Sequence, residues 1–387
     1  MKNVLIITTV SGFLEKFEKN NVKILQEMGY TVHYAANMNE QHYLFDVDKL
    51  KAEGIVLHHI DIEKSPYMLL NNSKAYRQLR EIIKDNDISV LHCHTPVGGF
   101  LGRLVGKRVG KKLKVIYTAH GFHFYERAPL INQTLYKGAE RMMARNTDVL
   151  VVINEEDYEY SKTLKLRKSG KVYRIPGVGL DLEKFQPLSK EDIKKKREEL
   201  GLAPDEHMIV SVGELNENKN QRVILEAMTK LVGDGKQDLK VKYFICGDGF
   251  YRNKIDEWIS QMGLEDHVVK CGYQRDVRGV LGCADALVFP SKREGLGMVG
   301  LEALAMSVPA IVSDNRGTRE YIKDEYNGLV CKSNTAEEYV DCIKRVLAMT
   351  PKQKAKIRAA GQDTVKEFGN GKTIGIMKEV YSQVGQL

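Results

Sequence analysis

The chain has 387 residues, of which 43% are hydrophobic and 28% are charged. This length exceeds one core of typical size and predicts two domains of a soluble α/β protein. No apolar run approaches the roughly 18 residues that a membrane-spanning helix needs, and the opening MKNVLIITTV predicts a strand rather than a signal peptide. The six cysteines stand without a CxxC pair, which favours reduced thiols in a cytoplasmic protein and excludes a disulfide scaffold.

The net charge of +8 is unevenly distributed. Residues 1–180 hold 27 Lys and Arg against 19 Asp and Glu, whereas residues 181–387 hold 32 against 32. The whole positive excess therefore lies in the first half. This asymmetry indicates an anionic partner for that half, such as a membrane surface, a nucleic acid or a phosphorylated acceptor.

Strand-like apolar runs alternate with helical patterns, such as 17–28 and 71–86, in both halves of the chain. Such alternation is typical of parallel, doubly wound sheets. The expected strands are 4–9, 31–36, 55–60, 89–94, 114–119, 148–153 and 171–175 in the first half, and 208–213, 241–247, 268–273, 286–290, 310–313 and 328–331 in the second.

The segment IPGVGLDLEKFQPLSKEDIKKKREEL (175–200) separates the two sets of strands with prolines and glycines. We therefore expect an N-terminal Rossmann-like domain over 1–187 and a C-terminal one over 188–365, with 366–387 packing back on the first. Open parallel sheets bind ligands at the carboxyl ends of their strands. A two-sheet protein of this kind is expected to bind its ligands between the domains.

Three loops that follow strands have a composition suited to phosphate. Gly12 lies in the turn after the first strand, but the full GxGxxG is absent, so a close approach to a diphosphate and a plain tight turn remain open. Lys219 in GELNENKNQ (213–221) enters a helix and either meets a phosphate as a point charge or is solvated. Gly247 in CGDG forms another glycine turn after a strand.

The segment PSKREGLGMVGLEALAMSVP (290–309) has a carboxylate at each end of a glycine-rich turn that enters a helix. Gly297 and its neighbouring glycines allow a ligand to approach the backbone, and the start of the helix offers N–H groups to phosphate or sugar oxygens. Glu294 and Glu302 would accept hydrogen bonds from hydroxyl pairs. The alternative is one surface glutamate and one helix glutamate without a shared role.

The histidines of HCHT (His92, His94) and TAHGFHFY (His120, His123) do not predict a metal site, because no carboxylate or cysteine ligand spacing accompanies them. His120 differs from the others, since it ends a strand and precedes a glycine. There it would hydrogen-bond to a sugar or phosphate, although a structural histidine remains the alternative.

The segment 97–114 is a basic amphipathic stretch in which Arg103, Lys107 and Lys111 recur every four residues. One interpretation is contact with anionic lipid or a lipid diphosphate. The other is an ordinary helix on the sheet with a solvated basic face. Nucleic acid is not expected as a partner, because no aromatic residues are interleaved with the basic ones.

Taken together, these segments resemble the retaining nucleotide-sugar glycosyltransferases of family 4, in particular those of bacterial capsules and exopolysaccharides. That family has the GT-B fold, in which two Rossmann-like domains face each other across a cleft. The resemblance covers essentially the whole chain. It rests on the turn at Gly12, TAHGF with His120, IPGVGLDLEKF, the stretch from Gly213 to Lys219, CGDG, the pair Glu294 and Glu302, and SDNRGTREYI followed by NGLV.

The resemblance implies a catalytic group made of His120, Glu294 and Lys219. Lys219 would neutralise the diphosphate, Glu294 would orient the hydroxyls of the donor sugar, and His120 would contact that sugar near the reacting carbon. Attack by the acceptor on the face from which the phosphate leaves retains the anomeric configuration, and the scheme requires neither a metal nor a cofactor. The donor-binding positions carried over are Gly12, Gly213, Lys219, Gly247, Glu294, Gly295, Leu296, Gly297, Met298 and Glu302.

The implied enzyme moves a hexose or N-acetylhexosamine from a nucleotide donor, UDP-linked, onto a growing surface glycan or a lipid-diphosphate acceptor. It would work in the cytoplasm, at the inner face of the membrane, with Arg103, Lys107 and Lys111 toward acceptor or lipid. Alternatives are a sugar-nucleotide epimerase of the same architecture and a non-catalytic partner subunit.

One position departs from the family pattern, because Glu214 stands where an arginine is usual. The second cation of the expected diphosphate clamp is then missing. The sequence does not decide which residue replaces it among Arg222, Arg275, Lys292 and Arg293.

Overall fold

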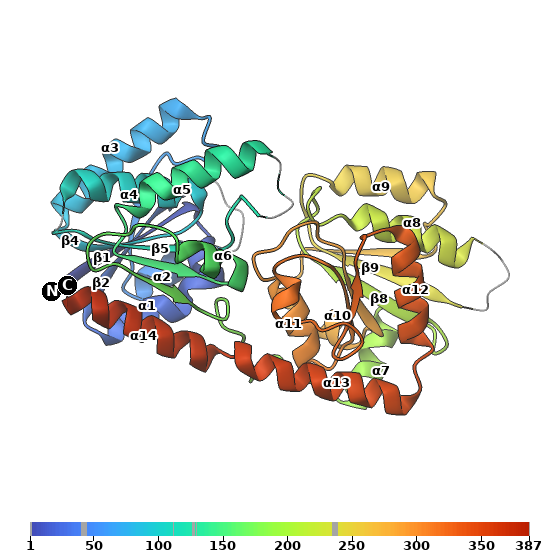
Figure 1. Cartoon of the computed structure of the whole chain (residues 1–387). Coiled ribbons are helices and arrows are strands. Elements are labelled where there is room, and N and C mark those ends of the chain that lie inside the picture. Colours follow the sequence, from blue (N-terminus) through green and yellow to red (C-terminus); the bar gives the residue numbers. More distant parts are fainter. Residues whose placement is uncertain are drawn as a thin grey trace. The chain divides into compact units, whose positions relative to one another are not determined.

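The computed structural model describes residues 2–39, 45–110, 112–125, 128, 130–233 and 239–386. The chain forms two compact units, Met1–Gly179 together with Gly371–Leu387, and Leu180–Asn370. In each unit, helices lie on both faces of one parallel sheet (Figure 1). The two Rossmann-like sheets predicted from the alternating pattern are confirmed.

The first unit is built on a seven-stranded sheet of order β3-β2-β1-β4-β5-β6-β7, in which neighbours pair in parallel. The order reverses between β1 and β4, so the loops after these strands lie at the switch point where open sheets bind ligands. The strands are β1 (Lys2–Val10), β2 (Tyr30–Asn37), β3 (Val56–His59), β4 (Ile88–Cys93), β5 (Lys114–Ala119), β6 (Val149–Val152) and β7 (Lys171–Arg174). The helices are η1 (Leu14–Glu18), α1 (Lys19–Glu27), α2 (Val47–Ala52), α3 (Leu69–Asp85), α4 (Pro96–Val109), η2 (Asn132–Tyr136), α5 (Lys137–Ala144), α6 (Glu155–Ser161) and the C-terminal α14 (Asn370–Gln386).

The helix α4 packs against the sheet through glycines. A Cβ at Gly99 would lie 2.3 Å from the ring of Tyr117, and one at Gly102 would lie 2.2 Å from Cys93 Sγ. Any larger residue at either position would force α4 away from the strands beneath it. The backbone of α4 is therefore held close to β4 and β5.

The second unit is built on a six-stranded parallel sheet of order β10-β9-β8-β11-β12-β13. Its order reverses between β8 and β11, so the loops that follow these two strands lie at its switch point. The strands are β8 (His207–Val212), β9 (Val241–Cys246), β10 (Val268–Gly272), β11 (Ala286–Phe289), β12 (Ala310–Ser313) and β13 (Leu329–Cys331). The helices are α7 (Lys190–Glu199), α8 (Gln221–Val232), α9 (Arg252–Gln261), α10 (Arg278–Gly282), α11 (Met298–Ala305), η3 (Thr318–Glu320), α12 (Ala336–Leu347), α13 (Pro351–Val365) and η4 (Lys366–Phe368).

The second unit begins at Leu180, whose carbonyl accepts a hydrogen bond at 2.9 Å from the backbone N–H of Asn370, the last residue of the same unit. The boundary expected from the sequence was residue 187, whereas the first compact unit ends at Gly179. The helix α14 then lies on the first unit (Figure 1). Its Tyr381 hydroxyl is 2.8 Å from Nδ1 of the buried His92.

All thirteen expected strands are present within about two residues of their predicted bounds. Each is short and apolar and is bounded by turns, a pattern that local sequence predicts well. Within the described parts of the chain, no helix is both long enough and apolar enough to cross a membrane.

Candidate active site

In the second unit, the loop after β8 fixes the position of Lys219. The loop packs against Gly247, where a Cβ would lie 1.8 Å from the carbonyl oxygen of Gly213, so only glycine fits. Within the loop, the Asn216 side-chain oxygen accepts a hydrogen bond from the backbone N–H of Lys219 at 3.0 Å. Gly213 and Gly247, both predicted from the sequence, thus belong to the support of Lys219.

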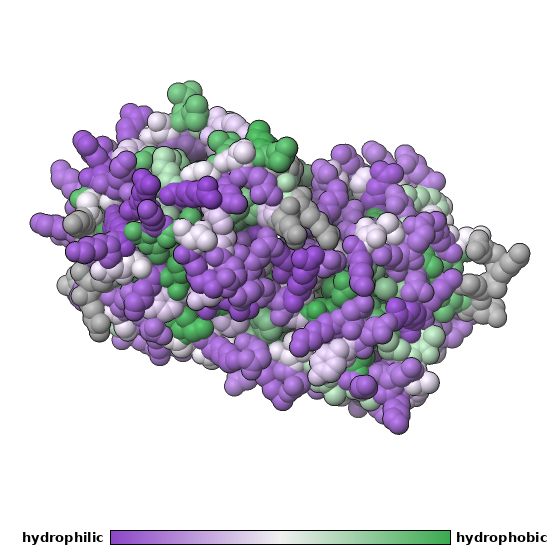
Figure 2. All heavy atoms as spheres, viewed as in Figure 1, coloured by the Kyte–Doolittle hydropathy of each residue, from purple (hydrophilic) through white to green (hydrophobic). Residues whose placement is uncertain are grey.

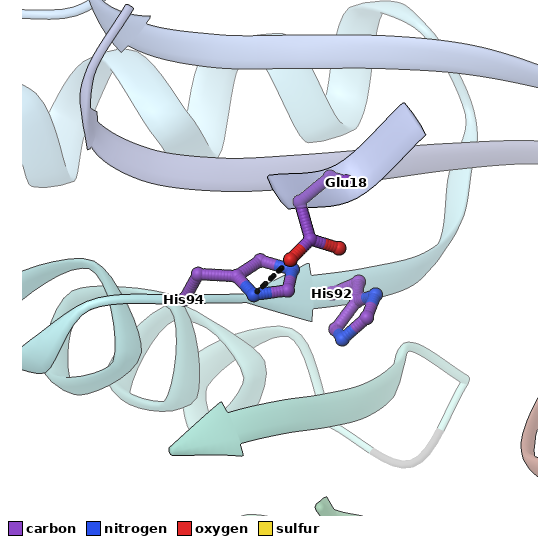
Figure 3. A group of neighbouring side chains, drawn as sticks. All are labelled: Glu18, His92 and His94. Carbon is purple, nitrogen blue, oxygen red and sulfur yellow. Dashed lines mark ion pairs between the residues drawn. The ribbon is translucent and has the colours of Figure 1, made fainter. Parts of the chain in front are cut away.

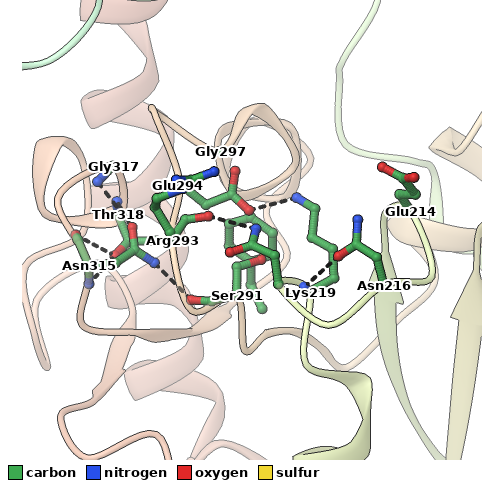
Figure 4. A network of polar contacts seen from close by, with 12 residues as sticks. Glu214, Asn216, Lys219, Ser291, Arg293, Glu294, Gly297, Asn315, Gly317 and Thr318 are labelled. Carbon is green, nitrogen blue, oxygen red and sulfur yellow. Dashed lines mark hydrogen bonds and ion pairs between the residues drawn. The ribbon is translucent and has the colours of Figure 1, made fainter. Parts of the chain in front are cut away.

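Lys219 contacts Glu294 from the loop that follows β11. Its Nζ lies 2.6 Å from Glu294 Oε1, with 22% and 13% of the two side chains exposed. The same Nζ is 5.0 Å from the ring centroid of Phe289, the last residue of β11. Partial burial strengthens the attraction relative to a surface pair, while the exposed fraction leaves both charges within reach of a ligand. The sequence placed these residues in one site, and the structure brings them into direct contact (Figure 4).

The turn between Glu294 and α11 requires glycine. Gly297 has φ +87° and ψ 66°, the left-handed region, and a Cβ there would lie 2.7 Å from the Phe289 ring. The Tyr321 hydroxyl donates a hydrogen bond to the Gly297 carbonyl at 2.9 Å. The turn therefore holds the first turn of α11 at a defined place, with the positive end of the helix dipole beside the Lys219 and Glu294 charges.

Glu302 lies on α11 and is half-buried. The buried Tyr321 has a pKa raised well above its usual value, first by burial and then by the negative charges of Glu294 and Glu302. Both carboxylates therefore act on the same hydroxyl. Tyr321 was not singled out in the sequence, although it belongs to the SDNRGTREYI segment.

A second turn, after β12, supports the Glu294 loop. The Asn315 amide donates to the Ser291 carbonyl at 3.2 Å, and its side-chain oxygen accepts from the backbone N–H groups of Gly317 and Thr318 at 3.0 and 3.2 Å (Figure 4). A Cβ at Gly317 would lie 2.8 Å from Glu294 Cβ. This turn belongs to the SDNRGTREYI segment on which the resemblance partly rests, but none of its residues was assigned to the site. Its Asn and Gly are residues typical of turns.

Glu214 lies apart from the Lys219 and Glu294 pair, on the other side of Lys219 in Figure 4. A different cation is close to the pair: the buried Arg316 donates from Nε to the Glu294 carbonyl at 3.4 Å. Arg316 was not among the replacements considered for the family arginine.

Two of the candidates that were considered are engaged elsewhere. Arg222 Nε lies 2.9 Å from Glu226 Oε1, one turn along α8, and Lys292 Nζ lies 3.1 Å from Glu217 Oε1. In both pairs the cation is about half exposed. These are surface pairs, which hold their side chains weakly.

In the first unit, Gly12 and His120 both lie in loops at the carboxyl ends of strands near the switch point of the sheet. Gly12 lies in the turn between β1 and η1, and His120 comes directly after β5. The ring of Phe13 meets the His120 ring edge-on, with centroids 5.1 Å apart and planes at 77°. The turn that holds Gly12 is thus packed on the predicted catalytic histidine.

His120 also belongs to a buried polar cluster. Its Nε2 lies 3.1 Å from His94 Nδ1, and Glu18 Oε1 lies 3.3 Å from the same His94 atom and 3.8 Å from His120 Nε2. His92 lies beside them (Figure 3). The sequence shows no carboxylate at ligand spacing from these histidines, but η1 brings Glu18 to them from a separate part of the chain.

Burial determines the electrostatics of this cluster. It lowers the pKa of His92 to about 3, that of His120 to about 4 and that of His94 well below its usual value. It raises the pKa of Glu18 to about 8. Without a bound ion, all four groups are therefore neutral at pH 7.

The basic stripe predicted on α4 is wrong for Arg103. Its guanidinium makes a bidentate pair with Glu140 at 2.6 and 2.9 Å, stacks 4.0 Å from the ring centroid of Tyr117, and is 1% exposed. The helix α5 covers this side of α4 and supplies the carboxylate. Lys107 is exposed, and Lys111 lies outside the described residues.

Family models match both parts of the chain. Residues 4–154 match a model described as glycosyl transferase 4-like, and residues 192–363 match glycosyl transferases group 1. EpsD of Bacillus subtilis, a provisionally assigned glycosyltransferase, is 35% identical over 383 residues, which cover 98% of this chain and 96% of EpsD. The UDP-Gal:alpha-D-GlcNAc-diphosphoundecaprenol alpha-1,3-galactosyltransferase of Escherichia coli is 29% identical over 280 residues, 72% of this chain and 71% of that protein.

Solved structures agree on the fold. HepE of Anabaena, in complex with UDP, has a TM-score of 0.76 at 17% identity and covers 100% of both chains. WaaG, a glycosyltransferase involved in lipopolysaccharide biosynthesis, has a TM-score of 0.74 at 14% identity, over 97% of this chain and 99% of WaaG. The chain belongs to the group 1 glycosyltransferases, with a GT4-like N-terminal half and the GT-B fold.

Proposed function

We propose that this glycosyltransferase transfers a hexose or N-acetylhexosamine from a UDP-sugar to a growing surface glycan or a lipid-diphosphate acceptor, with retention of configuration. The contact between Lys219 and Glu294 at the start of α11 is the observation that carries this proposal. A nucleotide-sugar joins an anionic diphosphate to a ring of hydroxyls. A cation and a carboxylate in contact, one for each part, suit that junction.

Lys219 would neutralise the diphosphate as the nucleotide leaves, which is the moment when negative charge develops. Glu294 would accept hydrogen bonds from the sugar hydroxyls, and Glu302 from the ribose. The backbone from Gly295 to Met298 would donate to sugar or phosphate oxygens, in keeping with the helix start at this turn.

Two residues of the first unit would also contact the donor: Gly12 the diphosphate and His120 the transferred sugar. In same-face attack, the acceptor oxygen bonds to the anomeric carbon as the bond from that carbon to the phosphate oxygen breaks. The acceptor proton passes to the departing phosphate, and UDP is released. Neither a metal nor a cofactor takes part in this scheme.

The choice of donor and acceptor draws support from two named proteins. The Escherichia coli relative is named for UDP-galactose and for a diphosphoundecaprenol acceptor, and the HepE structure contains UDP. We extend both to this chain: UDP as the leaving nucleotide and a lipid diphosphate or its glycan as the acceptor.

Exposed apolar side chains on the first unit favour work at a membrane surface. Leu69 and Leu70 at the start of α3 are 73% and 87% exposed, and Leu130 and Ile131 before η2 are 84% and 61% exposed. Figure 2 shows hydrophobic side chains at these two places. Such side chains bind a bilayer interface when basic residues add attraction to anionic lipid. We place the protein at the inner face of the cell membrane on this basis.

Liposome flotation tests the membrane part. The wild type should float with vesicles that contain anionic phospholipid, and Leu69→Ser/Leu70→Ser should remain in the lower fractions. Equal partitioning of both proteins would contradict membrane binding through α3 and leave the transferase proposal untouched.

Nucleotide-sugar turnover tests the reaction. UDP-glucose, UDP-galactose and UDP-N-acetylglucosamine, with GDP- and ADP-glucose as comparisons, should reveal slow hydrolysis of one UDP-sugar and faster transfer when lipid-diphosphate sugar is added. Isomerisation of the donor without acceptor would instead identify an epimerase. Binding without any turnover would identify a non-catalytic subunit.

A further inference from the structure

Three potential metal ligands meet at the carboxyl ends of neighbouring strands in the first unit. His94 follows β4, His120 follows β5, and η1 brings Glu18 over both from the turn after β1. The sheet order places β4 between β1 and β5, so these three segments, far apart in sequence, converge at the switch point. The cluster lies wholly within the first unit.

The spacing of the three ligand atoms fits one ion. Glu18 Oε1, His94 Nδ1 and His120 Nε2 are separated by 3.3, 3.1 and 3.8 Å. Two ligands of a tetrahedral Zn²⁺, each about 2.0–2.1 Å from the metal, lie about 3.3 Å apart. We propose that Glu18, His94 and His120 form a three-ligand site for a divalent transition-metal ion, with Zn²⁺ as the type case.

His92 is close enough to be considered, because ligand atoms of Glu18, His92 and His94 all lie within 4.8 Å of one another. Both of its ring nitrogens are engaged, however. Nε2 lies 2.8 Å from the Thr118 hydroxyl, and Nδ1 lies 2.8 Å from the Tyr381 hydroxyl of α14. His92 therefore ties α14 to the sheet, and His120 is the third ligand.

The surroundings hold the ligands in position. Asn21 donates from Nδ2 to Glu18 Oε2 at 2.6 Å, which leaves Oε1 facing the two imidazoles. Such outer partners orient metal ligands and affect affinity strongly.

A small cavity borders the cluster and offers an open coordination position. Glu18 and His120 line it together with Asn20, Asn21 and Thr118. Zinc sites with three protein ligands keep their fourth position for water or for another small ligand. Two of the three proposed ligands, Glu18 and His120, line the cavity, so a fourth coordination position would open toward it.

Metal binding would also set the chemistry of His120, a step that rests on the proposed function. An imidazole that binds a metal through Nε2 carries its proton on Nδ1. His120 would then always present an N–H donor to a sugar oxygen. The ion would hold the His120 ring in one orientation and would take no part in the making or breaking of bonds.

Metal titration of the full-length protein tests the site directly, with a readout that does not depend on sugar transfer. Protein dialysed against chelator should bind one Zn²⁺ per chain in competition with a chromophoric chelator. Glu18→Gln, which keeps the shape of the side chain, and His94→Gln should each weaken Zn²⁺ binding by more than about tenfold. Loss of a residue that only orients a ligand already weakens metal binding by about 10- to 100-fold, so loss of a ligand should weaken it at least as much.

The control uses the other histidine pair of this unit, His33 and His58, whose Nδ1 and Nε2 lie 2.9 Å apart. His58→Gln should bind Zn²⁺ as the wild type does. Unaltered binding in Glu18→Gln, or a loss of binding in His58→Gln equal to that in His94→Gln, would overturn the proposal.

The visible absorption spectrum of Co²⁺ bound to the wild-type protein distinguishes this site from a thiol site. This measurement does not depend on the folding of any variant. The rival is the pair Cys331 and Cys342, whose Sγ atoms lie 3.7 Å apart. The proposal predicts visible d–d absorption of four-coordinate Co²⁺ without a thiolate charge-transfer band. A strong thiolate band, or no binding of either ion, would overturn it.

Discussion

The two units handle charged side chains in opposite ways. In the second unit, the side chains of Lys219 and Glu294 keep 22% and 13% of their surface exposed. In the first, the side chain of Arg103, paired with Glu140, is 2% exposed, and the buried Glu18 and His94 are neutral near pH 7. A half-open pair can exchange its partner for a ligand, whereas breaking a buried pair leaves an uncompensated charge. Access, rather than charge, distinguishes a ligand site from an architectural contact.

The largest effect is expected where a buried charge loses its partner. Arg103→Met should lower the free energy of unfolding by about 3–5 kcal/mol, because Glu140 would remain without its bidentate cation. Urea unfolding followed by circular dichroism measures this change. Lys107→Met, one turn along α4 and exposed, should shift the free energy by only about 0.5 kcal/mol. Similar values for the two variants would remove the contrast between buried and exposed cations.

The next effect is a pH dependence caused by Glu18. Its pKa is about 8 in the folded state against 4.5 in the absence of burial, so the folded state holds the proton more tightly. The stability from this group is fully present below pH 4.5 and is lost as the pH rises toward 8, with a slope of up to about 1.4 kcal/mol per pH unit.

Urea unfolding in chelator, from pH 5 to pH 8, tests this dependence with Glu18→Gln as the comparison. The wild type should lose stability relative to the variant as the pH rises, and added Zn²⁺ should reverse that trend if the cluster binds the ion. A constant difference between wild type and variant would show that burial of Glu18 does not perturb its titration.

A smaller effect, on turnover rather than on stability, is expected at the partly exposed pair of Lys219 and Glu294. Lys219→Ala should lower turnover by at least about tenfold, corresponding to about 1.4 kcal/mol for a charge-assisted contact with the diphosphate. Far-ultraviolet circular dichroism should show an unchanged fold. Turnover near that of the wild type would contradict the role of Lys219.

The smallest effect is expected at the neighbouring surface pair. Lys292 and Glu217, with side chains 49% and 75% exposed, come from the same two loops as Lys219 and Glu294. Lys292→Ala should change turnover by less than about twofold, because exposed pairs contribute about 0–1 kcal/mol. A loss as large as that of Lys219→Ala would mean that Lys292 supplies the missing cation of the diphosphate clamp.

The fold was predictable because its signals are local. Short apolar strands bounded by turns identify the sheets. The glycine turns at Gly213, Gly247 and Gly297 identify the loops that hold Lys219 and Glu294 in the second unit. Lys219 and Glu294 were predicted for one site by the resemblance to the family 4 glycosyltransferases. Their direct contact was not predictable, since it depends on loop conformations that Asn216 and Asn315 hold.

The errors have a common physical origin in contacts between distant segments. Glu18 was part of an ordinary helical pattern, and only the sheet order brings it to His94 and His120. Arg103 recurs with Lys107 at helical spacing, which predicts an exposed face when the neighbours of a helix are unknown. In the folded chain, α5 covers that position and its Glu140 pairs with Arg103, which is therefore buried.

The central claim is that Lys219 in the second unit binds the diphosphate of a UDP-sugar. Isothermal titration of UDP into the wild type, Lys219→Ala and Lys292→Ala tests it most directly. The wild type and Lys292→Ala should bind UDP with the same affinity to within about twofold, and Lys219→Ala at least about tenfold more weakly. Equal affinity in all three proteins, or no binding of UDP to the wild type, would contradict the claim.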